Sequence, residues 1–382
     1  MSLRIPLSAP DITEAEIEAV SAVLRTNSLS LGPKLEEFEG ALSAYHGMPH
    51  AIAVNSGTAA LHLAIRALGI GEGDEVIVPS FTFIAVANAV RYERATPVFV
   101  DIDPLTLNID PACVEAVITP RTRAIVVVHT FGVPAEMDAL MQLARSHNLF
   151  VIEDACEAIG ATYSGKPVGS FGDIAALAFY PNKQITTGEG GAVLTHDSHL
   201  ASRIRALRNQ GRYPTPSREQ DWLQHAELGY NYRLSEMACA LGIVQLNRLP
   251  SILAQRAEVA RRYDDSLSPI EGIVRPPLHL PSRTISWFVY AIRLAEPFSS
   301  NQRDKVLRFL QQQGIGCARY FAPIHRQPAY SQFPSALQAH LPVTEAIAQR
   351  TLALPFFNRL SVANTEEVST ALNSAIAQLQ TP

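Results

Sequence analysis

Short apolar segments alternate with helix-length segments between residues 50 and 195 of the chain. Several of the short segments are apolar over their whole length, which is typical of parallel strands that are covered on both faces. Because helix-length segments separate them, the pattern indicates a doubly wound α/β domain. Seven strands are predicted, over residues 51–55, 75–79, 97–101, 124–129, 150–154, 174–179 and 192–195.

Helical periodicity precedes and follows this strand-rich region. An N-terminal helix is predicted over 11–25, with Asp11 or Thr13 as its N-cap. A second helix follows Gly32–Pro33, because proline suits a first helical turn. After about residue 200, the predicted elements are a helix over 234–249, a helix over 251–267 starting past Pro250, a strand over 287–294, a helix over 301–313 ended by Gly314, and a final helix over 365–378.

The pattern therefore predicts two domains. The large domain, residues 1–250, contains a mostly parallel seven-stranded sheet between helices, and a smaller C-terminal α/β domain covers residues 251–382. Ligands of open parallel sheets lie outside the carboxyl ends of the strands. Residues that directly follow a strand are therefore the first candidates for chemistry.

Composition places the chain among soluble globular proteins. Of its 382 residues, 47% are hydrophobic and 18% are charged, and the net charge of -5 disfavours nucleic acid as the main partner. The four cysteines form no C-x-x-C pair and are expected to be reduced and buried. We find no signal-peptide pattern and no run of about 18 apolar residues, so we expect a cytoplasmic protein without a membrane partner.

Two charged residues lie at predicted strand ends. Lys183 follows an apolar strand and precedes a glycine-rich turn, which places it where a ligand would bind. Asp154 ends another apolar strand, where a carboxylate binds ribose, a metal or a protonated ring nitrogen, or caps the next segment. On position alone, a surface lysine and a capping carboxylate remain the alternatives.

A third candidate for ligand binding is the segment at residues 55–61, which consists mostly of small residues and connects a predicted strand to a predicted helix. The first helix amides, the hydroxyls of Ser56 and Thr58 and the helix dipole form an anion site, most often for phosphate, although an ordinary N-cap has the same local structure. A phosphate site, a strand-end carboxylate and a strand-end lysine are the three groups that pyridoxal phosphate requires. The carboxylate keeps the ring nitrogen protonated by charge pairing.

The most specific pattern in the chain is AFYPNKQ at 178–184, which runs into TGEGG at 187–191. Further motifs follow in order along the chain, at 56–61, 79–83, 151–155, 229–233 and 323–325. Together these segments resemble the DegT/DnrJ/EryC1/StrS family of sugar aminotransferases. The resemblance implies the fold of the fold-type I transferases that depend on pyridoxal 5′-phosphate.

The resemblance also implies roles for individual residues around the cofactor. Lys183 would bond covalently to pyridoxal 5′-phosphate and move the proton between Cα and C4′, while Asp154 would pair with the pyridinium nitrogen. Gly57 would hold the phosphate together with its neighbours Ser56 and Thr58. Phe83 would stack on the ring, although a phenylalanine in such a segment is more often a core residue.

Other implied roles concern the surroundings of the cofactor. Glu157 occupies a position near the cofactor hydroxyl where the family often has Gln or His. Asn231 would reach the phosphate across a dimer interface, which implies a homodimer with shared active sites. The chain departs from the family at Ala178, where many relatives carry a phosphate-binding Ser, so that Asn231, residues 56–58 or a water would take over that contact.

The substrate region implied by the resemblance contains His325, with Phe321 and Arg319 close to it in the chain. A histidine after Pro-Ile is otherwise a structural hydrogen-bonding group, so both interpretations stay open. Arg319 and Arg233 are suited to bind a phosphate or the carboxylate of an amino donor. No pattern of metal ligands is present, and we predict no required metal.

The implied activity is transfer of an amino group from glutamate to a nucleotide-linked keto sugar, most similar to 4-amino sugar formation in polysaccharide or glycan precursor synthesis. One alternative is a related cofactor-dependent sugar dehydratase, in which His replaces the lysine; Lys183 argues against it. The other is a regulatory or binding protein that has kept the fold and lost turnover. Such a regulator should carry a basic arm, which the sequence does not show.

Overall fold

A seven-stranded sheet forms the centre of the computed structural model, which describes residues 3–213 and 224–380. Its strands are β1 (His50–Val54), β2 (Glu75–Pro79), β3 (Thr96–Val100), β4 (Thr122–Val128), β5 (Phe150–Asp154), β8 (Ile174–Ala178) and β9 (Gly191–Thr195). The order in space is β1-β9-β8-β5-β4-β2-β3, and only β9 runs antiparallel to its neighbours. The seven predicted strands and the mostly parallel sheet are confirmed.

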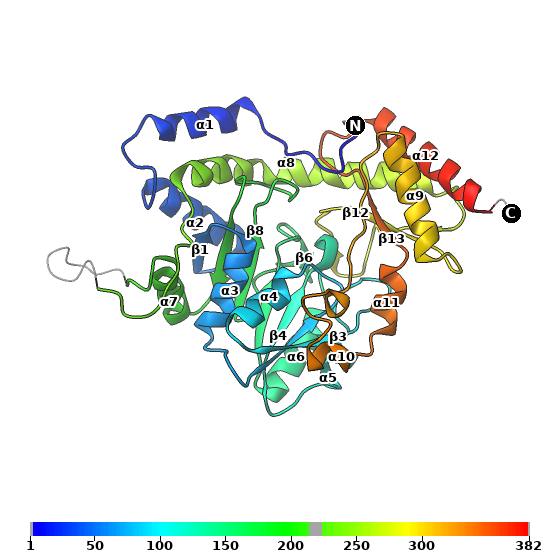
Figure 1. Ribbon diagram of the computed structural model, residues 1–382. Coiled ribbons are helices and arrows are strands. Elements are labelled where there is room, and N and C mark those ends of the chain that lie inside the picture. The colour runs from blue at the N-terminus through cyan, green and yellow to red at the C-terminus, as the bar shows by residue number, and fades with distance from the viewer. Residues whose placement is uncertain (1–2, 214–223, 381–382) are drawn as a thin grey trace.

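Helices cover both faces of this sheet (Figure 1). Alternate side chains of a strand point to opposite faces. Ile52 and Val54 accordingly join the core beneath one helical layer, while Ala51 and Ala53 join the core beneath the other. The first layer consists of α3 (Gly57–Ala67), α4 (Ala85–Tyr92) and α7 (Ser198–Arg208), and the second of α2 (Pro33–His46), α5 (Pro111–Glu115), α6 (Met137–His147) and part of α8 (Glu236–Leu267).

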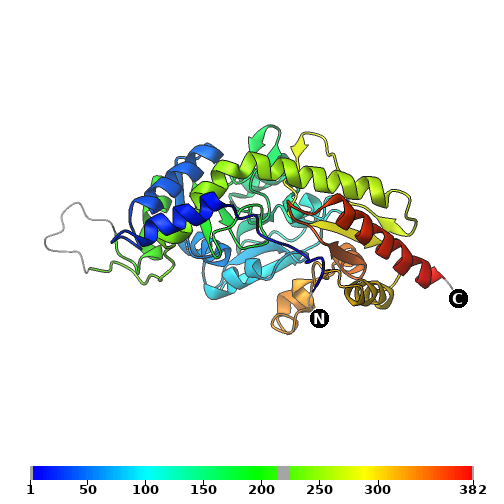
Figure 2. The same ribbon diagram turned by 90° about the horizontal axis from the view of Figure 1, so that it is seen from above.

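A smaller region lies beyond the sheet and has a core of its own. Its sheet contains β10 (Ile273–Val274), β12 (Tyr290–Leu294) and β13 (Thr351–Leu354), packed with α9 (Ser300–Gln312) and α12 (Val362–Gln380). Ile5 belongs to this core and pairs with Ile315, so the N-terminal segment lies against the small region (Figure 2). We propose the division into domains 1–250 and 251–382, which the small region's own core supports. Two segments cross this boundary, because Ile5 joins the small core and Ile324, Tyr330, Ala336 and Leu341 join the core of the large sheet.

Short elements complete the structure. A three-stranded sheet joins β6 (Thr162–Tyr163) and β7 (Lys166–Pro167) to β11 (Arg283–Thr284), so it connects segments distant in sequence. The remaining elements are α1 (Glu14–Leu24), η1 (Thr130–Gly132), η2 (Ile324–Arg326), α10 (Pro334–Leu337) and α11 (Pro342–Ala348). The N-cap of α1 is Thr13, one of the two predicted caps, and its capping box with Glu16 explains why the helix begins there.

The predicted break at Pro250 is wrong, because one continuous helix, α8, replaces the two predicted helices. A proline inside a helix loses one backbone hydrogen bond and costs about 3 kcal/mol. Leu249 and Ile252 flank it and are completely buried in the core that α8 shares with the large sheet. Burial on both sides of the proline therefore outweighs the local signal for a break.

Among the described residues, α8 is also the one helix that is long and apolar enough to cross a membrane, with a mean hydropathy of 1.3 in its most apolar window. It packs against α1, α2 and α12 and contributes side chains to the cores of both regions. Figure 1 shows α8 extending from α2 to α12. Its apolar character thus fits its place as the helix that joins the two cores.

The structure corrects three further expectations. The strand predicted over 287–294 begins only at Tyr290, because the carbonyls of Trp287 and Phe288 accept hydrogen bonds from a side chain instead of a strand. The final helix begins three residues before the predicted Thr365. Of the four cysteines, all unpaired, two are buried as expected and two, Cys113 and Cys156, are half-buried.

Candidate active site

The candidate site lies where β5, β8 and the start of α3 meet. Asp154 is the last residue of β5, which pairs with β8. The loop after β8 returns to the strand end, because the Phe179 amide donates to Gly190 (2.9 Å) and the Phe179 carbonyl accepts from Thr187 (3.0 Å). Lys183 sits in this closed loop, held by a bond from its amide to the Tyr180 carbonyl (2.9 Å).

The side chain of Lys183 points into a nearly closed space. Its Nζ lies 3.4 Å from Oε1 of Glu157 and 4.0 Å from the ring centroid of Phe288. The two charged side chains are only 13% and 9% exposed. The other carboxylate oxygen of Glu157 accepts from the Phe131 amide at 3.0 Å, which fixes the carboxylate toward the lysine.

Both Lys183 and Asp154 lie close enough to Glu157 and Cys156 to influence their charge states. Burial raises the pKa of Glu157, Lys183 and the Phe131 amide oppose that rise, and Asp154 reinforces it. Burial also raises the pKa of the Cys156 thiol well above its usual value, with a further contribution from Asp154 and an opposing one from Lys183. The structure therefore brings the predicted lysine and the predicted strand-end carboxylate into a single buried cluster.

The N-terminus of α3 closes the other end of this cluster. Ser56 is the N-cap, and its Oγ accepts from the Ala59 amide at 3.0 Å. A Cβ on Gly57 would lie 2.6 Å from Cβ of Ala178 and 3.1 Å from Sγ of Cys156, so only glycine permits this approach. The amides of Gly57 and Thr58 precede the cap bond and have no partner within the helix, which suits them to an anion.

These groups fit the cofactor that the sequence predicts. They comprise an amine, a carboxylate at the end of a neighbouring strand, and a helix N-terminus whose glycine lies against both β8 and residue 156. Such a set offers partners for the aldehyde, the ring nitrogen and the phosphate of pyridoxal 5′-phosphate.

Phe83 and the segment around Asn231 lie at the surface of this chain. Phe83 precedes α4 and is 61% exposed, which contradicts the alternative of a core phenylalanine, and its contact with the cofactor ring stays a prediction. Asn231 is exposed beside the end of β1, where Asn55 donates through its side chain to the Asn231 carbonyl (3.4 Å). Arg233 donates to Oδ1 of Asn209 at 3.0 Å.

The predicted substrate residues take up different environments. His325 has no exposed side-chain surface, because Nδ1 lies 2.7 Å from Oγ of Ser80 and Nε2 lies 3.0 Å from Oε1 of Glu345. A contact with substrate would require one of these bonds to open. Phe321 stacks on Phe131 with ring centroids 5.2 Å apart.

Arg319 lies on the surface, with its side chain 60% exposed and 2.7 Å from Oδ2 of Asp304. Together with Phe321, Arg326 and Glu345 it lines a hollow of about 260 Å³ on the small region. The roles of Arg319, Phe321 and His325 toward a substrate stay predictions.

Sequence reasoning missed residues that shape the surroundings of Lys183. The backbone amide of Phe131 donates to the carboxylate of Glu157. Phe131 has a φ of 56°, which lies in the left-handed region that few residues other than glycine adopt. It follows the strand β4, and the strand-end rule could have found it. Phe288 and Arg256 also contact the lysine segment, but no local pattern marks them. Gln184 lies within the motif at 178–184, and its Nε2 donates to the carbonyl of Glu157 at 2.6 Å.

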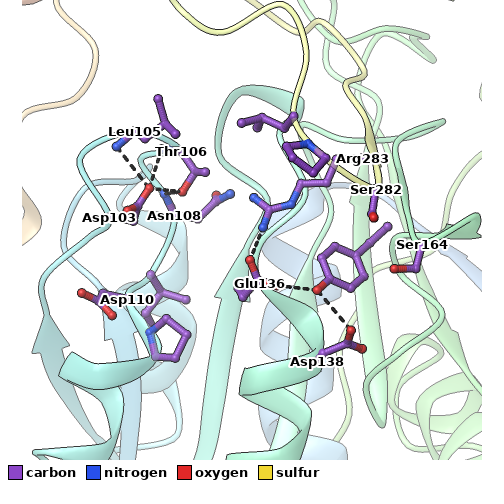
Figure 3. Close-up of a pocket in the computed structure, with 15 residues that line it drawn as sticks. Asp103, Leu105, Thr106, Asn108, Asp110, Glu136, Asp138, Ser164, Ser282 and Arg283 are labelled. Carbon is purple, nitrogen blue, oxygen red and sulfur yellow. Dashed lines mark hydrogen bonds and ion pairs between the residues drawn. The ribbon is translucent and has the colours of Figure 1, made fainter.

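A second hollow, of about 530 Å³, lies away from this cluster and collects carboxylates (Figure 3). Glu136 pairs with Arg283 and accepts from the hydroxyl of Tyr163, while Asp103 accepts from the amide of Thr106 at 2.7 Å. We call this hollow the acidic pocket. It is lined by Asp103, Leu105, Thr106, Asn108, Ile109, Asp110, Pro111, Glu136, Asp138, Tyr163, Ser164 and residues 280–283. Among the residues described, no group of three or more His, Cys, Asp or Glu side chains suits a metal ion.

The fold and the cluster together define a class. A mostly parallel sheet carrying a largely buried lysine, a strand-end carboxylate and a helix start suited to an anion is the arrangement of the fold-type I transferases that use pyridoxal 5′-phosphate. The predicted fold class is therefore confirmed.

Comparison with known proteins narrows the class. Residues 10–373 match the model of the DegT/DnrJ/EryC1/StrS aminotransferase family. The chain is 43% identical to GDP-perosamine synthase of Caulobacter vibrioides (98% of both chains) and 39% identical to the spore coat polysaccharide biosynthesis protein SpsC of Bacillus subtilis (97% of both). Its structure resembles that of the aminotransferase TlmJ from Streptoalloteichus hindustanus, with a TM-score of 0.92, 32% identity, and coverage of 99% of this chain and 100% of that one.

The chain thus belongs to the DegT/DnrJ/EryC1/StrS aminotransferase family, as its motifs predicted. It is a sugar aminotransferase that depends on pyridoxal 5′-phosphate, so the predictions of enzyme class and cofactor are confirmed.

Proposed function

We propose that the chain transfers an amino group from glutamate to a nucleotide-linked keto sugar, with C4 as the aminated position, in the synthesis of a polysaccharide or glycan precursor. The similarity to a GDP-perosamine synthase and to a spore coat polysaccharide protein supports this substrate class. The observation that carries the proposal is the buried contact between Lys183 and Glu157 beside Asp154.

Pyridoxal 5′-phosphate, when bound, supplies an electron sink for the carbon that loses its proton. In the proposed site, Nζ of Lys183 would hold the cofactor before the amino donor binds, and, once the donor has displaced it, the free amine would take up and return that proton. Asp154 would stabilise positive charge on the ring nitrogen, and Glu157 would orient the lysine amine. Phe288 covers Nζ and limits access of water to it.

The start of α3 would hold the phosphate. Its amides point along the helix axis toward the cluster, and Ser56 secures the first turn. Ala178 offers no hydroxyl at the position where many relatives have Ser. The amides of Gly57 and Thr58 would therefore donate a larger share of the hydrogen bonds to the phosphate.

We further propose that two copies of the chain form the active enzyme in the cytoplasm and share active sites, with Asn231 of one copy reaching the phosphate of the other. The exposed side chain of Tyr180 (50%), three residues before Lys183, supports this arrangement, and Phe83 is a second large exposed side chain (61%). The roles of Arg319, Phe321, His325 and Arg233 toward the sugar nucleotide and the donor belong to the same proposal.

The test combines trapping with a substrate panel. Borohydride treatment of the purified holoenzyme, followed by peptide mass analysis, should label Lys183. Lys183→Ala should lose at least about 10⁴-fold in transfer rate, because no other group supplies both the amine and the proton shuttle. Lys166→Ala, at the exposed first residue of β7, should keep wild-type activity.

Keto sugar nucleotides that differ in base and ketone position, each assayed with several amino donors, would then identify the substrate by product mass. Near-normal transamination by Lys183→Ala would contradict the assignment of the lysine. Deoxygenation without amination would instead favour a dehydratase.

A further inference from the structure

Arg256 is a completely buried arginine on α8 without an acidic partner in the described part of the chain. It is 2% exposed, and its guanidinium donates only to backbone carbonyls. Nη2 lies 3.0 Å from the carbonyl of Lys183, and Nη1 lies 3.3 Å from the carbonyls of both Trp287 and Phe288. One side chain therefore holds two segments that are distant in the sequence.

Burying this charge is costly. Burial lowers the pKa of Arg256 to about 10, with only a partial opposing effect from Asp11, which is itself paired with Arg248 and Arg359. The ring of Phe356, 5.5 Å from the guanidinium carbon, adds a cation–π contact. A core that needed only packing at this place would be served better by an apolar side chain of similar volume.

The two segments that Arg256 joins are the two that define the position of Nζ. One is the backbone of Lys183 itself, and the other carries Phe288, whose ring lies 4.0 Å from Nζ. Gln184 makes a parallel connection, because its Nε2 donates to the carbonyls of Glu157 (2.6 Å) and Ser286 (2.9 Å). Glu157, Lys183 and Phe288 are thus tied together through their backbones.

We propose that Arg256 is a positioning residue for Lys183, whose planar guanidinium fixes the lysine backbone against the segment bearing Phe288. The inference rests on the proposed role of Lys183 as the cofactor-bearing residue. A guanidinium sets both the distance and the orientation of the carbonyls that it binds, which a lysine ammonium does not. Small displacements of a reacting group carry large losses in rate, so this connection matters for the chemistry.

The test compares Arg256→Met with Arg256→Lys and with a matched control, Arg262→Met. Arg262 lies six residues further along α8, is 17% exposed at its side chain, and donates to the carbonyl of Leu360 at 2.8 Å, away from the lysine segment. All three variants lose or weaken arginine-to-carbonyl bonds on the same helix. Only the first two affect Lys183.

Three readouts separate positioning from stability. We expect Arg256→Met to lower kcat about 30-fold while KM for donor and sugar nucleotide changes less than about threefold. The midpoint of the pH titration of the bound cofactor's visible absorbance should shift by about 0.5 units or more. In the apo-protein, amide hydrogen exchange of residues 180–188 should accelerate about tenfold.

Arg256→Lys should fall between wild type and Arg256→Met in each readout. It keeps the positive charge but lacks the planar guanidinium whose two terminal nitrogens bind the carbonyls of both segments. Arg262→Met should lower the melting temperature without moving kcat, the absorbance midpoint or exchange at 180–188. Wild-type values for Arg256→Met, or equal effects of Arg262→Met, would overturn the proposal. If Arg256→Met does not fold, Arg256→Lys decides, and wild-type values for it would overturn the proposal equally.

Borohydride labelling of the wild type keeps the two proposals apart. A label on another lysine would refute the proposed role of Lys183 and with it the inference. A label on Lys183, combined with unchanged kinetics, absorbance and exchange in the Arg256 variants, would refute the inference about Arg256 alone.

Discussion

The Lys183 cluster and the acidic pocket both collect carboxylates after strands of the large sheet, yet their chemistry differs. In the acidic pocket, Glu136 pairs with Arg283, whose guanidinium stays charged at any physiological pH. In the cluster, Glu157 pairs with Lys183, whose primary amine, unlike a guanidinium, can form a covalent bond with an aldehyde. The nature of the cation, more than the number of acids or the size of the hollow, therefore distinguishes a reactive site from a structural one.

Burial sharpens the difference. The Glu136 side chain is 46% exposed, whereas that of Glu157 is 9% exposed. Water can solvate the first carboxylate, while the second depends on Lys183 and the Phe131 amide for its stabilisation. The cluster is thus a place where changes of charge have large energetic consequences, and the acidic pocket is not.

The largest expected effect in this comparison comes from removing one carboxylate charge at each place. Asp154→Asn should lower kcat about 10²-fold or more, because the ring nitrogen of the cofactor would lose the charged partner that we propose for it. Glu136→Gln, the matched change in the acidic pocket, should leave kcat within about twofold of wild type. Steady-state kinetics with both substrates would measure this, and equal losses in the two variants would erase the distinction.

A smaller effect, on cofactor binding, is expected at the helix start beside the Lys183 cluster, and the helix start beside the acidic pocket serves as the comparison. The first turn of α5, at the acidic pocket, is occupied by the side chain of Asp110, which accepts from the Ala112 amide at 2.9 Å. At the start of α3, Gly57 lies against Ala178 instead, and no acidic side chain caps the helix. We expect Gly57→Ala to force these parts about 1 Å apart and to weaken cofactor binding about tenfold.

Fluorescence titration of the apo-protein with pyridoxal 5′-phosphate would measure this loss. Gly40→Ala is the matched control, because a Cβ there meets nothing within 4 Å and Gly40 lies within the helix α2. Its cofactor affinity should equal that of the wild type. Unchanged affinity in Gly57→Ala would show that the helix start does not hold the phosphate.

The parts of the fold that the sequence predicts are those that depend on local pattern. All strands of the large sheet could be predicted, since burial on both faces makes most positions of each strand apolar. The direction of β9 could not, because an antiparallel buried strand has the same composition as a parallel one. Pro250 predicts a helix break from local sequence alone. The helix continues because the neighbours of Pro250 are buried in the assembled core.

The same limit applies to the candidate site. Lys183 and Asp154 could be predicted because the ends of strands are recognisable in sequence, and the sheet order then places them together. The contacts of Arg256 and Phe288 depend on the packing of α8 and the small region against the loop after β8. Arg256 is 73 positions from Lys183, and no periodicity or motif connects them.

The smallest expected effect concerns the pH dependence of stability, and it tests whether Glu157 is as desolvated as the comparison requires. Burial raises the folded-state pKa of Glu157 above the usual 4.5, so the native apo-protein binds more protons than the unfolded chain between those two values. The contribution of Glu157 to the free energy of unfolding should therefore be greatest below pH 4.5. It should fall as the pH rises through the folded-state pKa, by at most about 1.4 kcal/mol per pH unit.

Glu157→Gln should remove this fall, because glutamine resembles the protonated acid and its Oε1 can still accept from the Phe131 amide. Lys183→Met should instead extend the fall to higher pH, since Lys183 opposes the rise in the pKa of Glu157. Urea unfolding of the apo-proteins across this pH range would resolve both changes. If the Glu157→Gln and wild-type curves run parallel, the carboxylate is hydrated like that of Glu136, and the contrast between the two regions loses its electrostatic basis.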